Sequence, residues 1–288
     1  MFTKTQSRST AILLTSLLAT ALMLSACFPA DPTSTPNPTA ATTPLAVLES
    51  TATTAPSATA PAATAVPTPD GSLHLLLDTG SLATGLQTET VAAVSASENA
   101  PYWEVLPEYT RATLQGYPLS SHSIQPQIFI YPVQDLEKVN EGAGKVVVSL
   151  QTLLKSPQEI PTMPFLPLVN AVQVMHAHIQ YLDFKNGQGL RYLTAFSQGI
   201  VPINNFELIY TYQGLTSDGK YYVAAMLPVN HPSLPADGQV TGKEPPEFTS
   251  DFPAYRANVA KALNTQAANT FTPDLTQLDA MMSSLEIK

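Results

Sequence analysis

The sequence has 288 residues, with 13 Lys and Arg against 22 Asp and Glu, which gives a formal net charge of −9 at neutral pH. An acidic chain of this kind repels phosphate backbones and anionic lipid headgroups, and no basic run offsets the charge. We therefore expect no nucleic-acid partner. A single cysteine excludes an internal disulfide and makes Cys27 an attachment point.

Residues 1–26 have the layout of an export signal peptide. Lys4 and Arg8 precede an apolar stretch from Ala11 to Leu24, which is too short to remain as a spanning helix. The segment Leu24-Ser25-Ala26-Cys27 resembles the lipobox of bacterial lipoproteins. That resemblance implies a diacylglyceryl group on the Cys27 sulfur and cleavage before it. The alternative is an ordinary secretory signal, or an uncleaved anchor, with a chance cysteine.

The predicted location follows from the lipid on Cys27. It is the outer face of the cytoplasmic membrane, or the outer membrane of a host with two membranes. Each buried methylene adds about 0.8 kcal/mol of membrane affinity, so two or three acyl chains hold a protein durably. Loss of the signal peptide removes Lys4 and Arg8 and leaves 11 basic against 22 acidic residues, a net charge near −11.

Residues 27–70 are predicted to form a disordered linker after the lipidated cysteine. From residue 28 to 69 the chain is almost entirely Pro, Thr, Ser and Ala, with Asp31 and Glu49 as its charges. Such a composition buries too little apolar surface to offset its ordering entropy. A chain of this length reaches roughly 35 to 130 Å, depending on its polyproline content. It could lift a domain clear of the membrane.

Residues 71–288 are long enough for one domain with a sizeable core. In the first half of this domain the sequence predicts strands followed by one helix. Apolar residues recur along that helix at spacings of three and four from Leu136 to Leu153, including Val139. The helix should stop at Ser156-Pro157, where a proline-rich loop follows up to Pro167. The predicted strands are Leu73 to Leu77, Thr88 to Val94, Val105 to Leu114 and Gln127 to Tyr131.

Two hairpins are predicted in the second half. The first turns at Asn186-Gly187 and the second at Asp218-Gly219, because both dipeptides can supply the positive φ of tight turns. From Phe206 to Gln213 apolar residues alternate with Glu207, Thr211 and Gln213. This alternation predicts an antiparallel sheet with one covered face.

The chain end is predicted to be helical. Tyr255, Val259 and Leu263 follow Pro253 at steps of four, and Thr272-Pro273 resembles the N-cap and first turn of a last helix. A short strand from Leu285 to Ile287 would follow. The whole pattern predicts an α+β domain with an antiparallel sheet of about six to eight strands packed with helices. The last helix should bury Leu275, Leu278 and Met282.

The last 120 residues or so also resemble, in patterning, the PsbP-like and Mog1-like domains. That resemblance implies an α/β/α sandwich and a binding or assembly module without a shared catalytic set, and it assigns no site residues. Some bacterial lipoproteins carry such domains. The resemblance lies in Tyr192, Tyr210, Asp218-Gly219-Lys220-Tyr221-Tyr222 and the pattern from Leu275 through Leu278-Asp279, Met281 and Ser284-Leu285.

The pair His176-x-His178 is the sharpest candidate for a metal site. Side chains at i and i+2 of a strand point to one face and could share zinc or copper. Further ligands would have to come from Asp183, Glu207, His122 or His231. Sheet histidines that bond to backbone or water are the favoured interpretation, since no further ligand spacing accompanies the pair.

Four other groups of residues could carry chemistry, but each also has an ordinary structural explanation. His231, before Pro232, is expected to be a turn histidine rather than a base, and Ser217 lies in a predicted hairpin turn rather than in a nucleophile elbow. The hairpin tyrosines are expected to pack in the core rather than line a ligand cleft. A sugar site with acid/base work could be formed by Glu104 and Glu108 with Tyr102, Trp103 and Tyr109.

The sequence thus favours a non-catalytic envelope module that binds another protein, a wall component or a small ligand. The alternative is a metal-dependent hydrolase that uses His176 and His178. A capture lipoprotein of a solute importer is disfavoured, because about 218 residues without an alternating βαβ pattern leave little room for two lobes.

Overall fold

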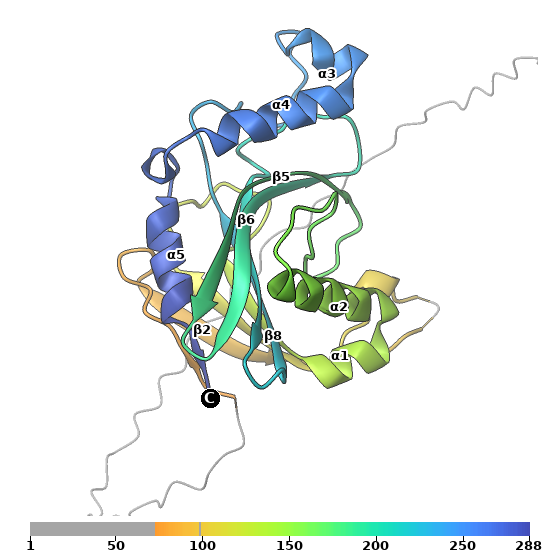
Figure 1. Cartoon of the computed structure of the whole chain (residues 1–288), viewed down its shortest axis with the longest axis vertical. Coiled ribbons are helices and arrows are strands. Elements are labelled where there is room, and N and C mark those ends of the chain that lie inside the picture. Colours follow the sequence, from red (N-terminus) through yellow and green to blue (C-terminus); the bar gives the residue numbers. More distant parts are fainter. Residues whose placement is uncertain (1–72, 98) are drawn as a thin grey trace, which may run out of the picture. The chain divides into compact units, whose positions relative to one another are not determined.

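A computed structural model describes residues 73–97 and 99–288, which belong to one compact unit (Figure 1). The predicted signal peptide, Cys27 and the predicted linker lie outside the described residues. No helix within the described part of the chain is both long and apolar enough to cross a membrane.

Seven antiparallel strands form the main sheet, in the order β2-β3-β4-β8-β7-β6-β5. This confirms the predicted α+β class and strand number. A second, two-stranded sheet pairs β1 (Leu75–Leu76) with β9 (Glu286–Ile287). The main strands are β2 Gly85–Val91, β3 Tyr109–Gln115, β4 Gln127–Pro132, β5 Val172–Phe184, β6 Gly187–Ser197, β7 Ile209–Thr216 and β8 Tyr221–Pro228.

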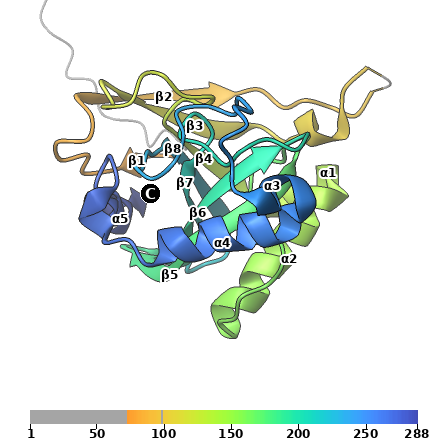
Figure 2. The ribbon, with the colours of Figure 1, turned by 90° about the horizontal axis from the view of Figure 1, so that it is seen from above.

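Helices cover both faces of the sheet, which corrects the expectation of one covered face (Figures 1 and 2). On one face lie α1 (Val133–Val139), α2 (Glu141–Lys155) and the proline-rich loop, whose Phe165 and Leu166 are buried. On the other lie α4 (Phe252–Asn264) and α5 (Leu275–Ser284). Thr211 and Gln213, expected on an open face, are fully buried because the loop covers them. The shorter helices are η1 (Tyr102–Glu104), α3 (Pro246–Ser250) and η2 (Ala268–Thr270).

The single helix predicted around Leu136 to Leu153 is two helices, with a break at Asn140. The backbone of Asn140 is extended, and its side chain accepts a hydrogen bond from the Ala143 amide at 3.1 Å as the N-cap of α2. The same side chain donates to the carbonyls of Tyr102 and Val105 at 2.6 and 3.0 Å. Val139 is consequently exposed rather than buried, whereas the predicted stop at Ser156 is confirmed.

The two predicted hairpins are present, but the first turn differs from the prediction. In the first, Lys185 and Asn186 form the loop, and neither Asn186 nor Gly187 has a positive φ. Gly187 is needed for space, since a Cβ there would overlap the Phe184 ring. In the second, Gly219 has the expected φ of +70°. Strand β7 begins at Ile209, and Phe206 lies outside it and is exposed.

The last helix has its N-cap at Asp274 rather than at the predicted Thr272. The Asp274 side chain accepts from the Thr276 amide at 2.8 Å, whereas Thr272-Pro273 is a cis peptide and Thr272 pairs with Asn230. The expected final strand is confirmed as β9. The predicted apolar side chains Leu275, Leu278 and Met282 are fully buried.

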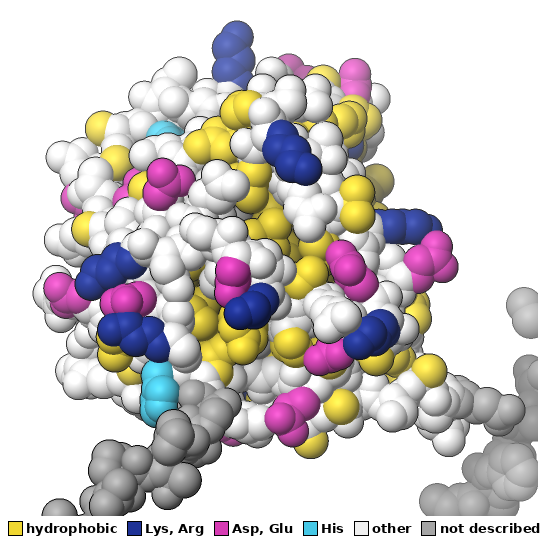
Figure 3. Space-filling model, turned by 60° about the horizontal axis from the view of Figure 1, so that its bottom comes forward, with side chains coloured by type: hydrophobic (Ala, Val, Ile, Leu, Met, Phe, Trp, Pro, Cys, Tyr) yellow, Lys and Arg dark blue, Asp and Glu magenta, His cyan; other side chains and the backbone are white. Residues whose placement is uncertain are grey.

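Charged side chains are intermixed on the face drawn in Figure 3, where basic and acidic groups lie side by side around an apolar centre. Exposed ion pairs of the domain include Lys220 with Asp218 and Lys288 with Glu286. Exposed pairs of this kind contribute only about 0 to 1 kcal/mol each. No field of one sign dominates this face.

Candidate functional site

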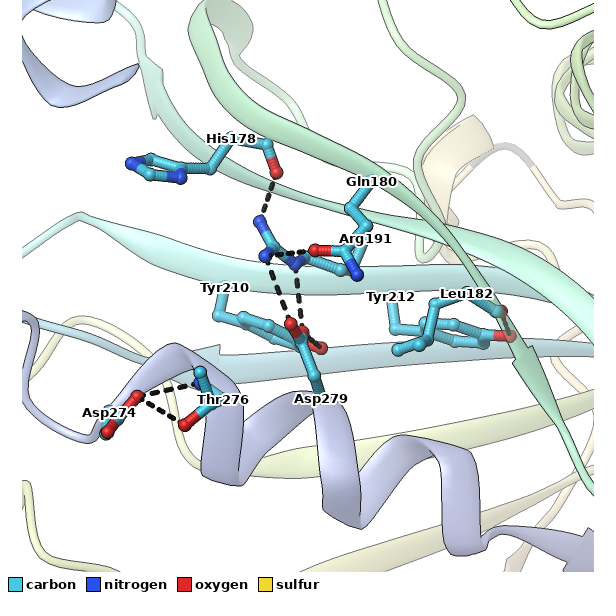
Figure 4. Close-up of polar contacts among 9 residues, drawn as sticks. All are labelled: His178, Gln180, Leu182, Arg191, Tyr210, Tyr212, Asp274, Thr276 and Asp279. Carbon is cyan, nitrogen blue, oxygen red and sulfur yellow. Dashed lines mark hydrogen bonds and ion pairs between the residues drawn. The ribbon is translucent and has the colours of Figure 1, made fainter. Parts of the chain in front are cut away.

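Arg191 is the most deeply buried charge among the described residues. Its guanidinium lies between β5, β6 and α5, and it is 5 % exposed (Figure 4). Two nitrogens donate to the Asp279 carboxylate at 2.9 and 3.0 Å, and one of them also donates to the Gln180 amide oxygen at 2.7 Å. The Tyr210 hydroxyl donates to the same carboxylate at 2.9 Å, so each charged group is fully surrounded by partners.

A β-bulge in β5 belongs to the same cluster. Between the pairs Ala177–Leu193 and Gln180–Arg191, two residues of β5 oppose one of β6, and His178 adopts a left-handed φ of 51°. The Arg191 guanidinium also donates to the His178 carbonyl. Burial raises the pKa of Tyr210 well above its usual range, and the Asp279 carboxylate adds to the effect. The cluster therefore holds sheet and helix together, with every polar group in a structural bond.

The two candidate metal ligands do not converge. His176 Nε2 lies 2.9 Å from Glu159 in the proline-rich loop, whereas His178 Nε2 lies 2.6 Å from the Leu263 carbonyl at the end of α4. The bulge separates them, so the i, i+2 rule of a regular strand does not apply. Within residues 73–97 and 99–288 no three His, Cys, Asp or Glu side chains are placed to hold a metal ion.

The further ligand candidates are bound elsewhere in the fold. His122 Nε2 lies 2.8 Å from the Leu208 carbonyl, and Glu207 accepts from Asn204 at 3.0 Å. His231 is 3 % exposed, and its ring nitrogens contact Ser233 and Thr270 in a turn, as predicted. Asp183 is exposed on β5.

The predicted sugar site around Trp103 is not assembled. Trp103 packs edge-to-face on Tyr102, with ring centroids 5.2 Å apart. Glu108 and Tyr109 line a shallow pocket that neither Glu104 nor Trp103 reaches. Ser217 lies in the second hairpin turn, as expected, and the hairpin tyrosines Tyr192, Tyr210, Tyr212 and Tyr222 are fully buried core residues, as predicted.

A polar groove of about 940 Å³ lies on the open end of the main sheet, over β2, β3 and β4. Directly opposed residues of antiparallel strands share a face, so the register places Gln87, Thr113 and Gln127 in one row across the three strands. The next row is Glu89, Arg111 and Phe129. Helices α1 and α2 cover this face over the other strands but leave the β2 edge open (Figure 2).

The polar side chains of this groove are ordered by bonds across the strands. Arg111 pairs with Glu89 at 2.8 Å, Gln115 donates to Gln87 at 3.2 Å, and Gln127 donates to Thr113 at 3.3 Å. Each amide keeps a free donor or acceptor towards solvent among the described residues. The groove is electrically neutral, because Arg111 and Glu89 cancel and burial lowers the pKa of its one histidine, His122.

This geometry suits an uncharged ligand that exchanges several hydrogen bonds. Planar amides and an Arg–Glu pair present donors and acceptors in fixed directions, which match vicinal hydroxyl groups. A sequence signal for this groove does exist. Polar residues occupy every second position of the two strands, at Gln87 and Glu89 and at Arg111, Thr113 and Gln115, and this pattern was not interpreted as a site.

Comparisons with known proteins give no relative. No protein-family model matches the chain, and neither a curated protein nor a solved structure matches it significantly. The resemblance to PsbP-like and Mog1-like domains therefore stays a prediction.

The Asp279→Asn substitution should destabilise the protein by about 3 to 5 kcal/mol, because it leaves the buried Arg191 charge uncompensated. The double variant Arg191→Met, Asp279→Leu should lose less, since it removes both charges. Asp183→Asn is a matched control on the exposed side of β5 and should stay within about 0.5 kcal/mol of wild type. Urea unfolding measures all three, and equal losses in the single and double variants would contradict the argument.

Stability should fall as the pH drops below about 6.5. Burial lowers the pKa of His122, His178 and His231 below the ordinary 6.5, so in this window the unfolded chain binds protons that the folded chain does not. The free energy of unfolding should therefore decrease until the folded-state pKa values are reached. His178→Asn, which tolerates the left-handed backbone, should flatten the dependence measured by urea unfolding from pH 7.5 to 5. An unchanged slope would refute this origin.

Proposed function

We propose that the protein is an exported, lipid-anchored binding module that holds an uncharged, hydroxyl-rich ligand in the groove over β2, β3 and β4. A glycan strand of the cell wall has this chemistry. The neutral row of amides in an open groove is the observation that carries the proposal. Its volume of about 940 Å³ lies in the range of ligand sites and is large enough for several sugar units.

Among the described residues, the histidine and the carboxylate of the groove are both engaged in bonds, which favours binding over catalysis. His122, His178 and His231 all bond to backbone or hydroxyl groups, and the buried Asp279 is paired with Arg191. A general base must instead be able to reach a substrate proton. The carboxylate that lines the groove is that of Glu89, and it already contacts two nitrogens of Arg111.

Membrane attachment is proposed from the residues before the domain. The segment Leu24-Ser25-Ala26-Cys27 supports lipidation, and residues 27–70 supply a spacer long enough to bring a domain to the wall. An acidic domain on such a spacer is repelled by anionic headgroups, which keeps its groove available to the wall.

The tetramer of N-acetylglucosamine, an uncharged glycan, should bind the full chain held in phosphatidylcholine nanodiscs, as measured by calorimetry. The double variant Gln87→Ala, Gln115→Ala should weaken that binding by roughly tenfold or more, because each lost hydrogen bond contributes about 1 kcal/mol. Both side chains are exposed or at the groove surface, so the fold should persist.

Thr88→Ala is the matched control, because Thr88 neighbours Gln87 on β2 but points to the opposite face. It should leave the affinity unchanged. Tetramer binding that the groove variant does not reduce, or no binding at all, would reject a glycan site in this groove.

Cys27→Ser should abolish lipid attachment and release the protein from the membrane, since the serine oxygen does not replace the thiolate as acceptor. Incorporation of labelled palmitate and fractionation of membranes measure the two effects. Ser25→Ala changes a small residue for another beside the cleavage site and serves as control. Membrane retention of Cys27→Ser would indicate an uncleaved anchor instead.

A further inference from the structure

A second groove, separate from the glycan groove, runs between α4, the start of β5 and the proline-rich loop. Its volume is about 420 Å³. Figures 1 and 2 show α4 lying along β5. The charged side chains that line it are Arg256 and Lys261 from α4 and Glu159 from the loop, and His176 from β5 also lines it.

Neither Arg256 nor Lys261 pairs with a carboxylate among the residues that the structure describes. Of the three arginines in the described residues, Arg111 and Arg191 form ion pairs, and Arg256 does not. Lys261 likewise pairs with no acid in the described part of the chain, although acidic residues outnumber basic ones in the sequence by 22 to 13. Two cations without an acidic partner that line one groove of an acidic protein create a local positive potential there.

Arg256 is held ready for a ligand. Its guanidinium donates to the Val174 carbonyl at 3.1 Å and lies 5.6 Å from the centre of the Phe252 ring. Its Nε atom is buried without a hydrogen-bond partner among the described residues, which leaves this group under-satisfied. The terminal nitrogens of this planar guanidinium, one of which also donates to Val174, match a carboxylate in a bidentate arrangement.

Half of the residues that line the groove are apolar, and Gln173 and Asn264 add polar groups to its walls. The apolar lining residues are Pro161 of the loop, Pro253, Ala257 and Ala260 of α4, and Val174 and Met175 of β5. These residues offer contact to carbon rather than to further polar groups. Glu159 is the one acid at the groove, and its side chain is 72 % exposed, so it lies at the rim.

We propose that this groove binds a small organic carboxylate, with its anionic end on Arg256 and Lys261 and its apolar body against Pro161, Pro253, Ala257 and Ala260. The site is independent of the glycan groove, which lies on another part of the sheet. The acidic rim residue Glu159 opposes the ligand charge and lowers its affinity.

The test uses 2-naphthoate as probe and 2-naphthamide as its uncharged isostere, with the full chain in phosphatidylcholine nanodiscs and calorimetric detection. The naphthoate should bind the wild type at least about tenfold more tightly than the amide, as expected for a charge-assisted bidentate bond. Equal binding of the two probes would overturn the proposal, because apolar contact alone would then explain it.

Four variants define the origin of the affinity. Arg256→Gln should weaken naphthoate binding by about tenfold or more, and the exposed Lys261→Gln by roughly two- to fivefold. Glu159→Gln should strengthen binding by roughly two- to fivefold, an effect of opposite sign that a merely damaged fold does not give. Lys185→Gln removes the same charge at the far end of β5 and should change nothing.

Two patterns would overturn the inference. One is an unchanged affinity in both Lys261→Gln and Glu159→Gln, which would mean that the groove charges do not act on the ligand. The other is an equal loss in Lys185→Gln, which would trace the effect to net charge. Neither pattern bears on glycan binding, so failure here leaves the proposed function to its own test.

Discussion

The ion pair of Arg191 with Asp279 fixes the arrangement of the second half of the domain. Because Arg191 also binds the His178 carbonyl, it holds the bulge of β5 open. The bulge turns His178 towards α4, where its backbone amide donates to the Asn264 side chain and its ring meets the Leu263 carbonyl. These bonds satisfy the C-terminal end of α4 and set it along the edge of the sheet. Both walls of the carboxylate groove follow from that position.

Local patterns predicted much of the fold, and the errors have tertiary causes. Alternating residues and Gly219 located the second hairpin, and steps of four located α4. The break at Asn140 escaped prediction, because apolar residues at helical spacing run through it and its cause is a contact with the distant Tyr102. Similarly, alternation along β7 indicated one polar face, whereas Gln213 is buried by bonds to Leu166 of the proline-rich loop. A single strand carries no information about what will cover it.

The candidate sites were harder to predict than the fold. His176 does line a groove, but it bonds to Glu159 there and shares the lining with Arg256, 80 positions further along the chain, rather than with His178. The glycan groove arises only when the register of β2 and β4 against β3 aligns their polar residues. A glutamine in a sequence does not indicate a particular chemistry, so polar residues at alternate positions of one strand gave no reason to expect a binding site. Pairing between strands turned these unremarkable residues into a continuous surface.

The pairing of β1 with β9 brings residues 73 and 288 to one corner of the domain. His74 and Lys288 exchange two backbone hydrogen bonds at 2.8 and 2.9 Å, and Leu75 opposes Ile287. A pull on the chain before residue 73 therefore loads this short ladder before it reaches the seven-stranded sheet. Such a pull would break the backbone hydrogen bonds of the ladder one after another, because it acts at the end where the two strands meet. Because Leu75 and Ile287 pack in the same apolar core as α5, opening this ladder would expose buried apolar surface, and the core therefore resists the pull.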